Sequence, residues 1–276
     1  MSMPRLIYFD FAGSRGEECR IALHLAGVDF EDVRVKSSDW PAMKTNMPFG
    51  AMPVLEIPGK PPLAHSNAIL VFIGRQHRLH PADAFEAARH ESLMSAVEEL
   101  RHTITPTLRI TDEAEKRRAR EALAANELRN WGSQVERQLG DGPFVGGAQL
   151  QVADLKLYMV VRWLTSGTVD YVPTSVFDHC PKLLALYRAV GGHPGVKAWL
   201  AMSGMVQRPW YLALWPPAVM TMRQATGPDW APTSLPLPVQ FAVSFCRKAL
   251  SAGPAKAGVA ETARRAARRT ETTLVR

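Results

Sequence analysis

Tyr8 stands near the end of a predicted buried strand, RLIYF, and a turn and a predicted helix follow it. A phenol in that place can donate a hydrogen bond to a sulfur held above the N-terminus of the helix, where the helix dipole adds to the effect. A hydrogen bond to a charged group is worth roughly 1.5–3 kcal/mol, which lowers a thiol pKa by about one to two units. The thiol then becomes largely thiolate, the nucleophilic form. The alternative is a tyrosine that only packs at the end of a sheet.

Four further positions have groups suited to hold a polar ligand. Trp40 and Lys44 are four residues apart, so a helical turn would place both on one face. Met52-Pro53 is an X-Pro bond, the type that can be cis. Ser66 is a predicted N-cap, and its hydroxyl and the helix N–H groups can take a carboxylate. The structural alternatives are a tryptophan that plugs the domain and a cap without a ligand.

Motifs of other chemistries are absent from the sequence. It has no CxxC, no GxGxxG between a strand and a helix, no Walker loop and no HExxH. The scattered Cys19, Cys180 and Cys246 form neither a disulfide framework nor a metal cluster. Cys19 is expected to pack inward, and no metal is expected in the chemistry.

An α/β segment over residues 5–76 must position these side chains. The strand RLIYF precedes an amphipathic helix over about residues 17–26, and FEDVRV alternates as a second strand. After a long loop, VLEI and a short strand at Leu63–Ala64 are joined by a proline-marked turn. Because the first two strands are joined through a helix and the last two by a turn, we expect a small mixed sheet.

From Pro81 onward the patterns are helical, with few β-branched runs. They predict an all-α second domain, with HPADA as the joint. The expected domains are therefore 1–81 and 85–206. A chain of 276 residues is long enough for two domains. Its composition, 46% hydrophobic and 21% charged residues, excludes a chain that is disordered throughout.

The net charge of +7 belongs to the segment 207–276, which has ten Lys/Arg against three Asp/Glu. Residues 1–206 carry 23 of each sign, so the folded body is not expected to bind nucleic acid. The segment is rich in Pro and Trp, then in Ala, Arg and Thr, and we expect it to be partly disordered. A solvated tail is favoured over a membrane-surface contact. No run of eighteen apolar residues and no signal peptide is present, so a cytoplasmic protein is expected.

The order of these segments resembles the cytosolic glutathione transferases. YFDFAGSRGEECRIALHLAGVDFEDVRV resembles the first strand–helix–strand of the tyrosine-type classes, and DWPAMKTNMPFGAMPVLEI the sigma-type loop and third strand. HSNAILVFIGRQH resembles the segment that closes the glutathione site. FVGGAQLQVADLKLY and FDHCPKLLALYRAVGGHPGVKAWL match the later helices. The resemblance covers about residues 5–205 and implies a thioredoxin-like domain followed by an all-helical one.

The resemblance implies that Tyr8 activates the thiol of glutathione, the co-substrate. Arg15 would support the thiolate or orient Tyr8, but the turn AGSRG has one residue more than the commonest sigma-type turn. Either Ser14 or Arg15 can therefore face the thiol. The alternative for Arg15 is a surface arginine.

The resemblance also assigns glutathione-binding roles along the first domain. Trp40 and Lys44 would hold the glycine end, the backbone of Met52 before Pro53 would pair with the cysteinyl segment, and Ser66 would take the γ-glutamyl carboxylate. The family's most constant structural element is a cis bond at this Met-Pro position.

Two positions depart from the family pattern and one belongs to the second domain. Ala51 replaces a common Lys or Gln, and His65 replaces the usual glutamine but keeps a donor. Glu98 would reach the glutathione amine of a neighbouring subunit, since the family is usually dimeric. The alternative for Glu98 is a solvated helix face.

The second substrate would be a hydrophobic electrophile, or a lipid peroxide that is isomerised as in some sigma relatives. Its pocket is expected beside the turn and on the second domain, with candidates Phe11, Met94, Arg101, Thr105 and Trp163. The alternative function, favoured by the departures at Ala51 and His65, is a binding or scaffolding protein of the same fold with little turnover.

Overall fold

A four-stranded mixed sheet forms the base of the first domain in the structure, a computed structural model that describes residues 3–203. The strands lie in the order β2-β1-β3-β4. Strand β1 (Arg5–Phe9) pairs in parallel with β2 (Glu31–Val35), whereas β3 (Val54–Glu56) pairs antiparallel with β1 and with β4 (Leu63–Ala64). The mixed sheet and the bounds of its first strand confirm the sequence prediction.

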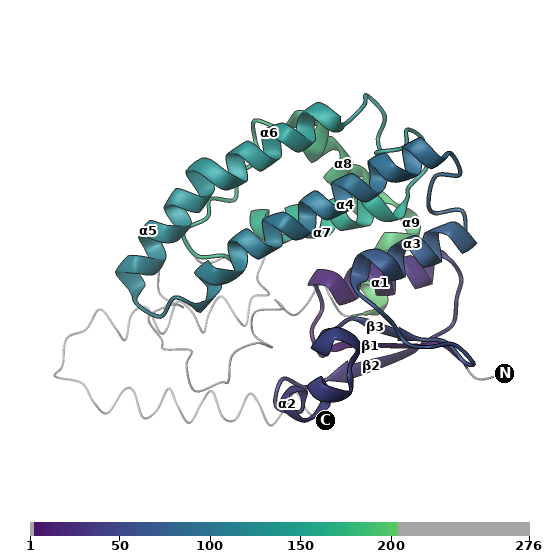
Figure 1. Cartoon of the computed structure of the whole chain (residues 1–276). Helices are drawn as coiled ribbons and strands as arrows, with labels where there is room; N and C mark the ends of the chain where they lie inside the picture. Colours follow the sequence, from purple (N-terminus) through teal and green to yellow (C-terminus); the bar gives the residue numbers. More distant parts are fainter. Residues whose placement is uncertain (1–2, 204–276) are drawn as a thin grey trace, which may run out of the picture. The chain divides into compact units, whose positions relative to one another are not determined.

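Alternation along β1 divides its side chains between two cores. Leu6 faces the main core, while Ile7 joins Val35, Val54 and Ala64 in a small cluster on the opposite face. Helices α1 (Ser14–Leu25) and α3 (Ser66–Gln76) cover the main-core face and pack against each other. Figure 1 shows both helices between the sheet and the helical domain. Tyr8, one residue beyond Ile7, thus lies at the sheet end from which the chain turns into α1.

The segment predicted as a long loop contains three short helical turns. They are α2 (Trp40–Met43), η1 (Lys44–Asn46) and η2 (Pro48–Gly50). Met43 and Met47 pack against the small cluster on the second face of the sheet. The proline at the start of α2 favours a helical φ value, which explains a turn where the apolar pattern gave no helix signal. In η2 the residues after the proline, Phe49 and Gly50, instead have positive φ.

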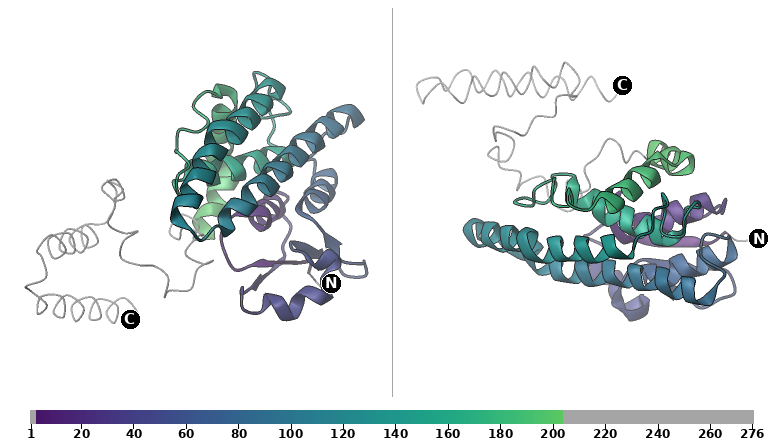
Figure 2. Two further views of the ribbon diagram at one scale, coloured as in Figure 1. Left: turned by 60° about the vertical axis from the view of Figure 1, so that its left-hand side comes forward. Right: turned by 90° about the horizontal axis from the view of Figure 1, so that it is seen from above.

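Helices make up the second domain, which confirms its predicted all-α class. In chain order they are α4 (Ala84–Ile104), η3 (Thr105–Arg109), α5 (Glu113–Leu123), a π-helical turn η4 (Ala124–Leu128), α6 (Arg129–Gln138), α7 (Val152–Thr165), α8 (Pro181–Gly192) and α9 (Pro194–Met202). Figure 2 shows them gathered on one side of the strands. The division at residues 81–85 falls between α3 and α4 and remains a prediction.

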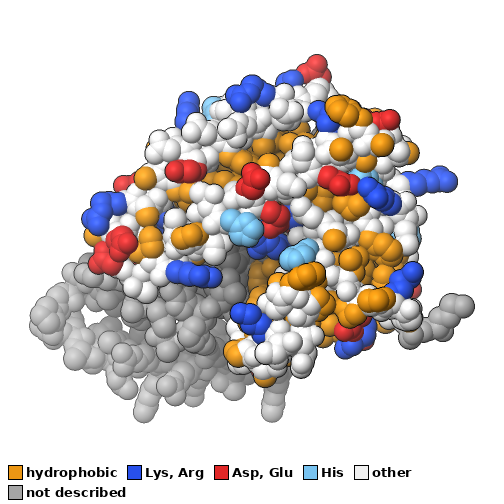
Figure 3. Space-filling model, viewed as in Figure 1, with side chains coloured by type: hydrophobic (Ala, Val, Ile, Leu, Met, Phe, Trp, Pro, Cys, Tyr) orange, Lys and Arg blue, Asp and Glu red, His pale blue; other side chains and the backbone are white. Residues whose placement is uncertain are grey.

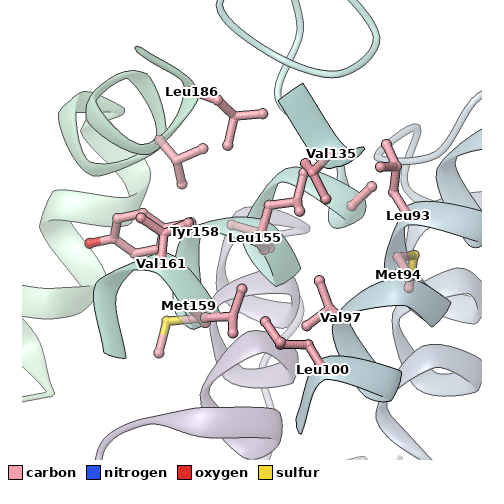
Figure 4. Close-up of a cluster of buried hydrophobic side chains, with 14 of the residues drawn as sticks. Leu93, Met94, Val97, Leu100, Val135, Leu155, Tyr158, Met159, Val161 and Leu186 are labelled. Atoms are coloured by element: carbon pink, nitrogen blue, oxygen red, sulfur yellow. The ribbon is translucent and has the colours of Figure 1, made fainter. Parts of the chain in front are cut away.

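The centre of the helical domain is apolar and is built around α7. Figure 4 shows Met159 and Leu155 of α7 facing Val97 and Leu100 of α4. Most of α7 is buried because it contacts α1, α3, α4 and α8. Helix α7 therefore brings side chains of the second domain directly against the first.

Asp154 fixes the start of α7. Its carboxylate accepts hydrogen bonds from the backbone N–H groups of Gln151, at 2.8 Å, and of Val145, at 2.7 Å. The preceding loop is thereby tied to the first turn of the helix, which holds the register of α7 against the first domain.

Candidate functional site

Tyr8 packs against the first turn of α1 and is only 4% exposed. This approach depends on Gly16, because a Cβ atom built there would clash with the tyrosine ring. Arg20 of the same helix lies under the turn: its guanidinium bonds the carbonyl of Phe11 and the carboxylates of Glu17 and Asp32. These contacts fix the turn between β1 and α1 and place the Tyr8 phenol at the N-terminus of α1.

The surroundings of Tyr8 keep its phenol protonated at neutral pH. Burial, the largest effect, raises the pKa of Tyr8, while a hydrogen bond with Ser14 and the charges of Arg15 and Arg101 lower it. Glu18 raises it again, and the net direction is upward. A protonated phenol is a hydrogen-bond donor and not a base.

Ser14 and Arg15 both lie at this turn, in different roles. Ser14 begins α1 with φ of 56°, and hydrogen bonding from its side chain lowers the pKa of Tyr8. Arg15 extends across to α4, where its Nε lies 2.7 Å from Oε2 of Glu98. Arg15 is thus paired with the second domain, and which of the two faces a thiol stays a prediction.

Trp40 and Lys44 lie on successive helical turns at the second face of the sheet. The ring of Trp40 is half-buried and meets Phe9 edge-on, with centroids 5.6 Å apart. Lys44 is exposed, and its stem lies beside Gly50. The tryptophan packs on β1, next to Tyr8, and the ammonium group remains in solvent.

The Met52-Pro53 peptide bond is cis, as predicted. It directly precedes β3, so the backbone of Met52 lies just before the N-terminal end of this inner strand. Ala51 before it has an extended backbone and is half-buried.

The prediction that Ser66 caps α3 is wrong, because the cap position belongs to His65. Ser66 is the first residue of the helix, while His65 precedes it with φ of 69° and is exposed. Ser66 is 3% exposed, and its hydroxyl oxygen accepts a hydrogen bond from Nζ of Lys156 at 2.8 Å. Helix α3 therefore begins at Ser66 itself, one residue earlier than it would if Ser66 were the N-cap, because the residue of positive φ before the helix is His65.

Glu98 belongs to a network of charges between the domains, not to a solvated helix face. We call Arg15, Glu18, Glu98, Arg101 and Lys156 the interdomain charge cluster. Burial would raise the pKa of Glu98, but Lys156, Arg101 and Arg15 lower it to about 2. Figure 3 shows acidic, basic and histidine side chains close together where the helical domain adjoins the first domain.

The other candidates for the electrophile pocket differ in their burial and in their contacts. Phe11 contacts the Tyr8 ring, with centroids 5.5 Å apart, and Trp163 is partly buried at the edge of the main core. Thr105 bonds the carbonyl of Arg101, whose own guanidinium is engaged by Glu18 and Glu98. Met94 is 1% exposed and lies in the core, which leaves it no surface for an electrophile.

Sequence analysis did not identify Gly16, Glu18, Arg20 or Lys156. Two of them carried a signal: Glu18 interrupts the buried side of the first helix, and Lys156 is the one charge inside the apolar run LKLYMVV. A charged residue within a buried apolar pattern predicts a partner of opposite charge. The sequence does not show, however, that Glu18 and Lys156, which are 138 positions apart, are partners of each other.

Cys19 is fully buried, as expected, and burial raises the pKa of its thiol. Within residues 3–203, no group of three His, Cys, Asp or Glu side chains is arranged to hold a metal ion. The helices of the described part include none long and apolar enough to cross a membrane. The predictions for residues 207–276, including Cys246, lie outside the described residues.

Two sequence families cover most of the described chain. Residues 4–75 match "Glutathione S-transferase, N-terminal domain" and residues 98–203 match "Glutathione S-transferase, C-terminal domain".

Individual relatives agree with this match. Glutathione S-transferase 1 of Ascaris suum is 30% identical over 206 residues, covering 73% of this chain and 97% of that protein. Hematopoietic prostaglandin D synthase of Gallus gallus is 28% identical over 197 residues, covering 71% and 94%. The solved structure of prostaglandin synthase D of Nilaparvata lugens superposes with a TM-score of 0.64 at 26% identity, covering 75% and 99%.

Proposed function

This chain belongs to the glutathione S-transferase family, and we propose that it conjugates the thiolate of glutathione, stabilised by Tyr8, to hydrophobic electrophiles. The proposal places it among the tyrosine-type, sigma-like members. Its domains would be the glutathione-binding domain 1–81 and the helical domain 85–206. The observation that carries the proposal is the buried, protonated phenol at the N-terminus of α1.

Tyr8 would act as a hydrogen-bond donor to the sulfur. Its phenol retains its proton at neutral pH because burial raises the pKa of Tyr8, and it would donate that proton in a hydrogen bond to the sulfur. Arg15 and Arg101 add positive charge near the same oxygen. Together these groups would lower the pKa of a bound thiol, so that its proton is released to solvent. The thiolate would then form a C–S bond with a carbon electrophile while the bond from that carbon to its leaving group, chloride in a chloronitrobenzene, breaks.

The glutathione backbone would extend along the sheet end next to Tyr8. Trp40 and Lys44 would hold its glycine end, with the exposed ammonium group of Lys44 facing the carboxylate. The backbone of Met52 before cis-Pro53 would pair with the cysteinyl segment. Ser66, His65 and the first N–H groups of α3 would receive the γ-glutamyl carboxylate.

A homodimer is part of the proposal. Phe49 is 82% exposed, although a bulky residue at its φ of 57° is strained. A second copy of the chain that covers this exposed apolar ring would account for both its exposure and the strained backbone of Phe49. Glu98, placed between the domains, would then face the glutathione amine of the partner.

The electrophile would bind between the turn and the helical domain. Phe11, Thr105 and Trp163 would contribute to this pocket, with Arg101 behind them. Because two relatives are named prostaglandin D synthases, isomerisation of a lipid peroxide at the same site is a second candidate reaction. A binding protein with little turnover is the alternative from a different class, since Ala51 and His65 depart from the family pattern.

Conjugation with a chloronitrobenzene acceptor tests the proposal. The wild-type protein should turn over, and Tyr8→Phe should lower the rate by about tenfold or more, because a hydrogen bond to a charged group is lost. Binding of glutathione without turnover would favour the non-catalytic alternative. Equal conjugation rates for the wild type and Tyr8→Phe would show that the Tyr8 hydroxyl does not contribute to the reaction.

A further inference from the structure

Lys156 is a buried charge that the proposed reaction does not use. It lies in the middle of α7, is fully buried, and reaches from the helical domain to the first turn of α3. Its ammonium group has three protons and meets three acceptors: Ser66 Oγ at 2.8 Å, Glu18 Oε2 at 3.0 Å and Glu98 Oε1 at 2.6 Å. The contacts with Ser66 and Glu18 are hydrogen bonds, and the contact with Glu98 is an ion pair.

The bond to Ser66 fixes the direction of the serine proton. An ammonium group only donates, so the Ser66 oxygen must accept from Lys156. The serine hydroxyl consequently keeps its own proton for another acceptor. A neutral side chain at position 156 would leave the hydroxyl free to rotate.

The interdomain charge cluster also has an uneven charge count. Arg15, Arg101 and Lys156 supply three positive charges, whereas Glu18 and Glu98 supply two negative ones. One positive charge is therefore not balanced within the cluster, and Lys156 brings one of its cations to the start of α3, where the helix N–H groups also favour an anion. The charge and the orientation of the hydroxyl favour the same kind of ligand group, a carboxylate.

We propose that Lys156 is a positioning residue for glutathione binding, which holds the Ser66 hydroxyl so that it donates to the γ-glutamyl α-carboxylate. This inference rests on the proposed function. It assigns part of the recognition of glutathione to the second domain, through a side chain that need not touch the ligand.

The test measures dissociation constants for two ligands. One is glutathione, and the other is 4-aminobutyryl-cysteinyl-glycine, which lacks only the γ-glutamyl α-carboxylate. Lys156→Met should weaken glutathione binding by about tenfold or more, because the oriented bond to a charged group is lost, and leave binding of the analogue unchanged. Ser66→Ala should give the same selective loss, with no further loss in the double variant.

Lys182→Met in α8 is the matched control. It makes the same substitution at a lysine that pairs with Asp141 and the carbonyl of Leu139, outside the cluster, so both ligands should bind as in the wild type. If Lys156→Met does not fold, Glu18→Leu/Lys156→Met removes the buried pair together, a change that is often tolerated. This double variant should show the same selective loss.

The outcomes separate the two proposals. Equal weakening of both ligands, or unchanged glutathione binding, in variants without Lys156 would overturn the positioning role while the proposed function stands. Failure of the wild-type protein to bind glutathione would instead overturn the proposed function, and this inference with it.

Discussion

A Cβ atom at Gly16 would lie 2.0 Å from Cδ1 and 2.3 Å from Cγ of Tyr8. The tyrosine ring thus occupies the space that any other residue at position 16 would need. The absence of a side chain in the first turn of α1 is what allows the phenol to reach the helix N-terminus.

Gly16→Ala should therefore displace Tyr8, although alanine is the better helix former. We expect a destabilisation of roughly 1–3 kcal/mol, measured by chemical unfolding, together with loss of most conjugation. Gly192→Ala in α8 is the matched control, because open space surrounds that position. Full activity and stability in Gly16→Ala would show that the ring does not need this position.

Ser14→Ala should remove the hydrogen bond to Tyr8 and lower kcat/KM for conjugation by about fivefold, a smaller effect than that of Tyr8→Phe. The phenol remains in place, but its oxygen is no longer held by the serine. Ser92→Ala, which removes a hydroxyl bonded only to its own helix, should have wild-type kinetics. A loss as large as that of Tyr8→Phe would mean that Ser14 itself contacts the thiol.

Phe49→Ser should shift the protein from dimer to monomer, as measured by sedimentation equilibrium at micromolar concentration. The variant removes the apolar ring that we expect a second copy to cover, and the fold should persist because the ring is exposed. Phe49→Tyr keeps an aromatic ring and should retain the dimer. A wild-type monomer, or a dimeric Phe49→Ser, would contradict this assignment.

His90 should make the fold sensitive to acid. Burial, with a smaller effect of His80, lowers the pKa of His90 from 6.5 to about 4. Between pH 6.5 and 4 the unfolded chain binds a proton that the folded chain excludes, so stability should fall as pH falls through this window, by up to about 3 kcal/mol.

The variant His90→Leu tests this by denaturant unfolding at several pH values. The stability of the variant should depend less on pH between 6.5 and 4 than that of the wild type. His77→Leu, at an exposed position, should keep the wild-type dependence. Parallel curves for the wild type and His90→Leu would show that His90 does not carry the effect.

Local patterns predicted the elements of this fold well where one face is buried. The strand Arg5–Phe9 has its predicted bounds because its apolar run is short and ends at a turn. Helix α1 instead begins at Ser14, earlier than the apolar pattern, because its first turn is held by tertiary contacts of Gly16 and Glu17.

Spacing and resemblance proposed Tyr8, Trp40, Pro53 and Ser66 as site residues, and these assignments remain predictions. The contacts among side chains could not be predicted. The bond from Lys156 to Ser66 joins side chains that are 90 positions apart, and only the packing of α7 on α3 brings them together. Pairing of this kind depends on the tertiary structure, so a single sequence does not contain it.

Ultraviolet titration of glutathione bound to the wild-type protein and to Tyr8→Phe tests the central claim most directly, because it reports the ionisation of the thiol itself. We predict that the wild type lowers the thiol pKa by about one to two units from its free value, and that Tyr8→Phe returns it by a similar amount. An unchanged pKa in Tyr8→Phe, or a bound thiol that does not ionise near neutral pH in the wild type, would contradict the account.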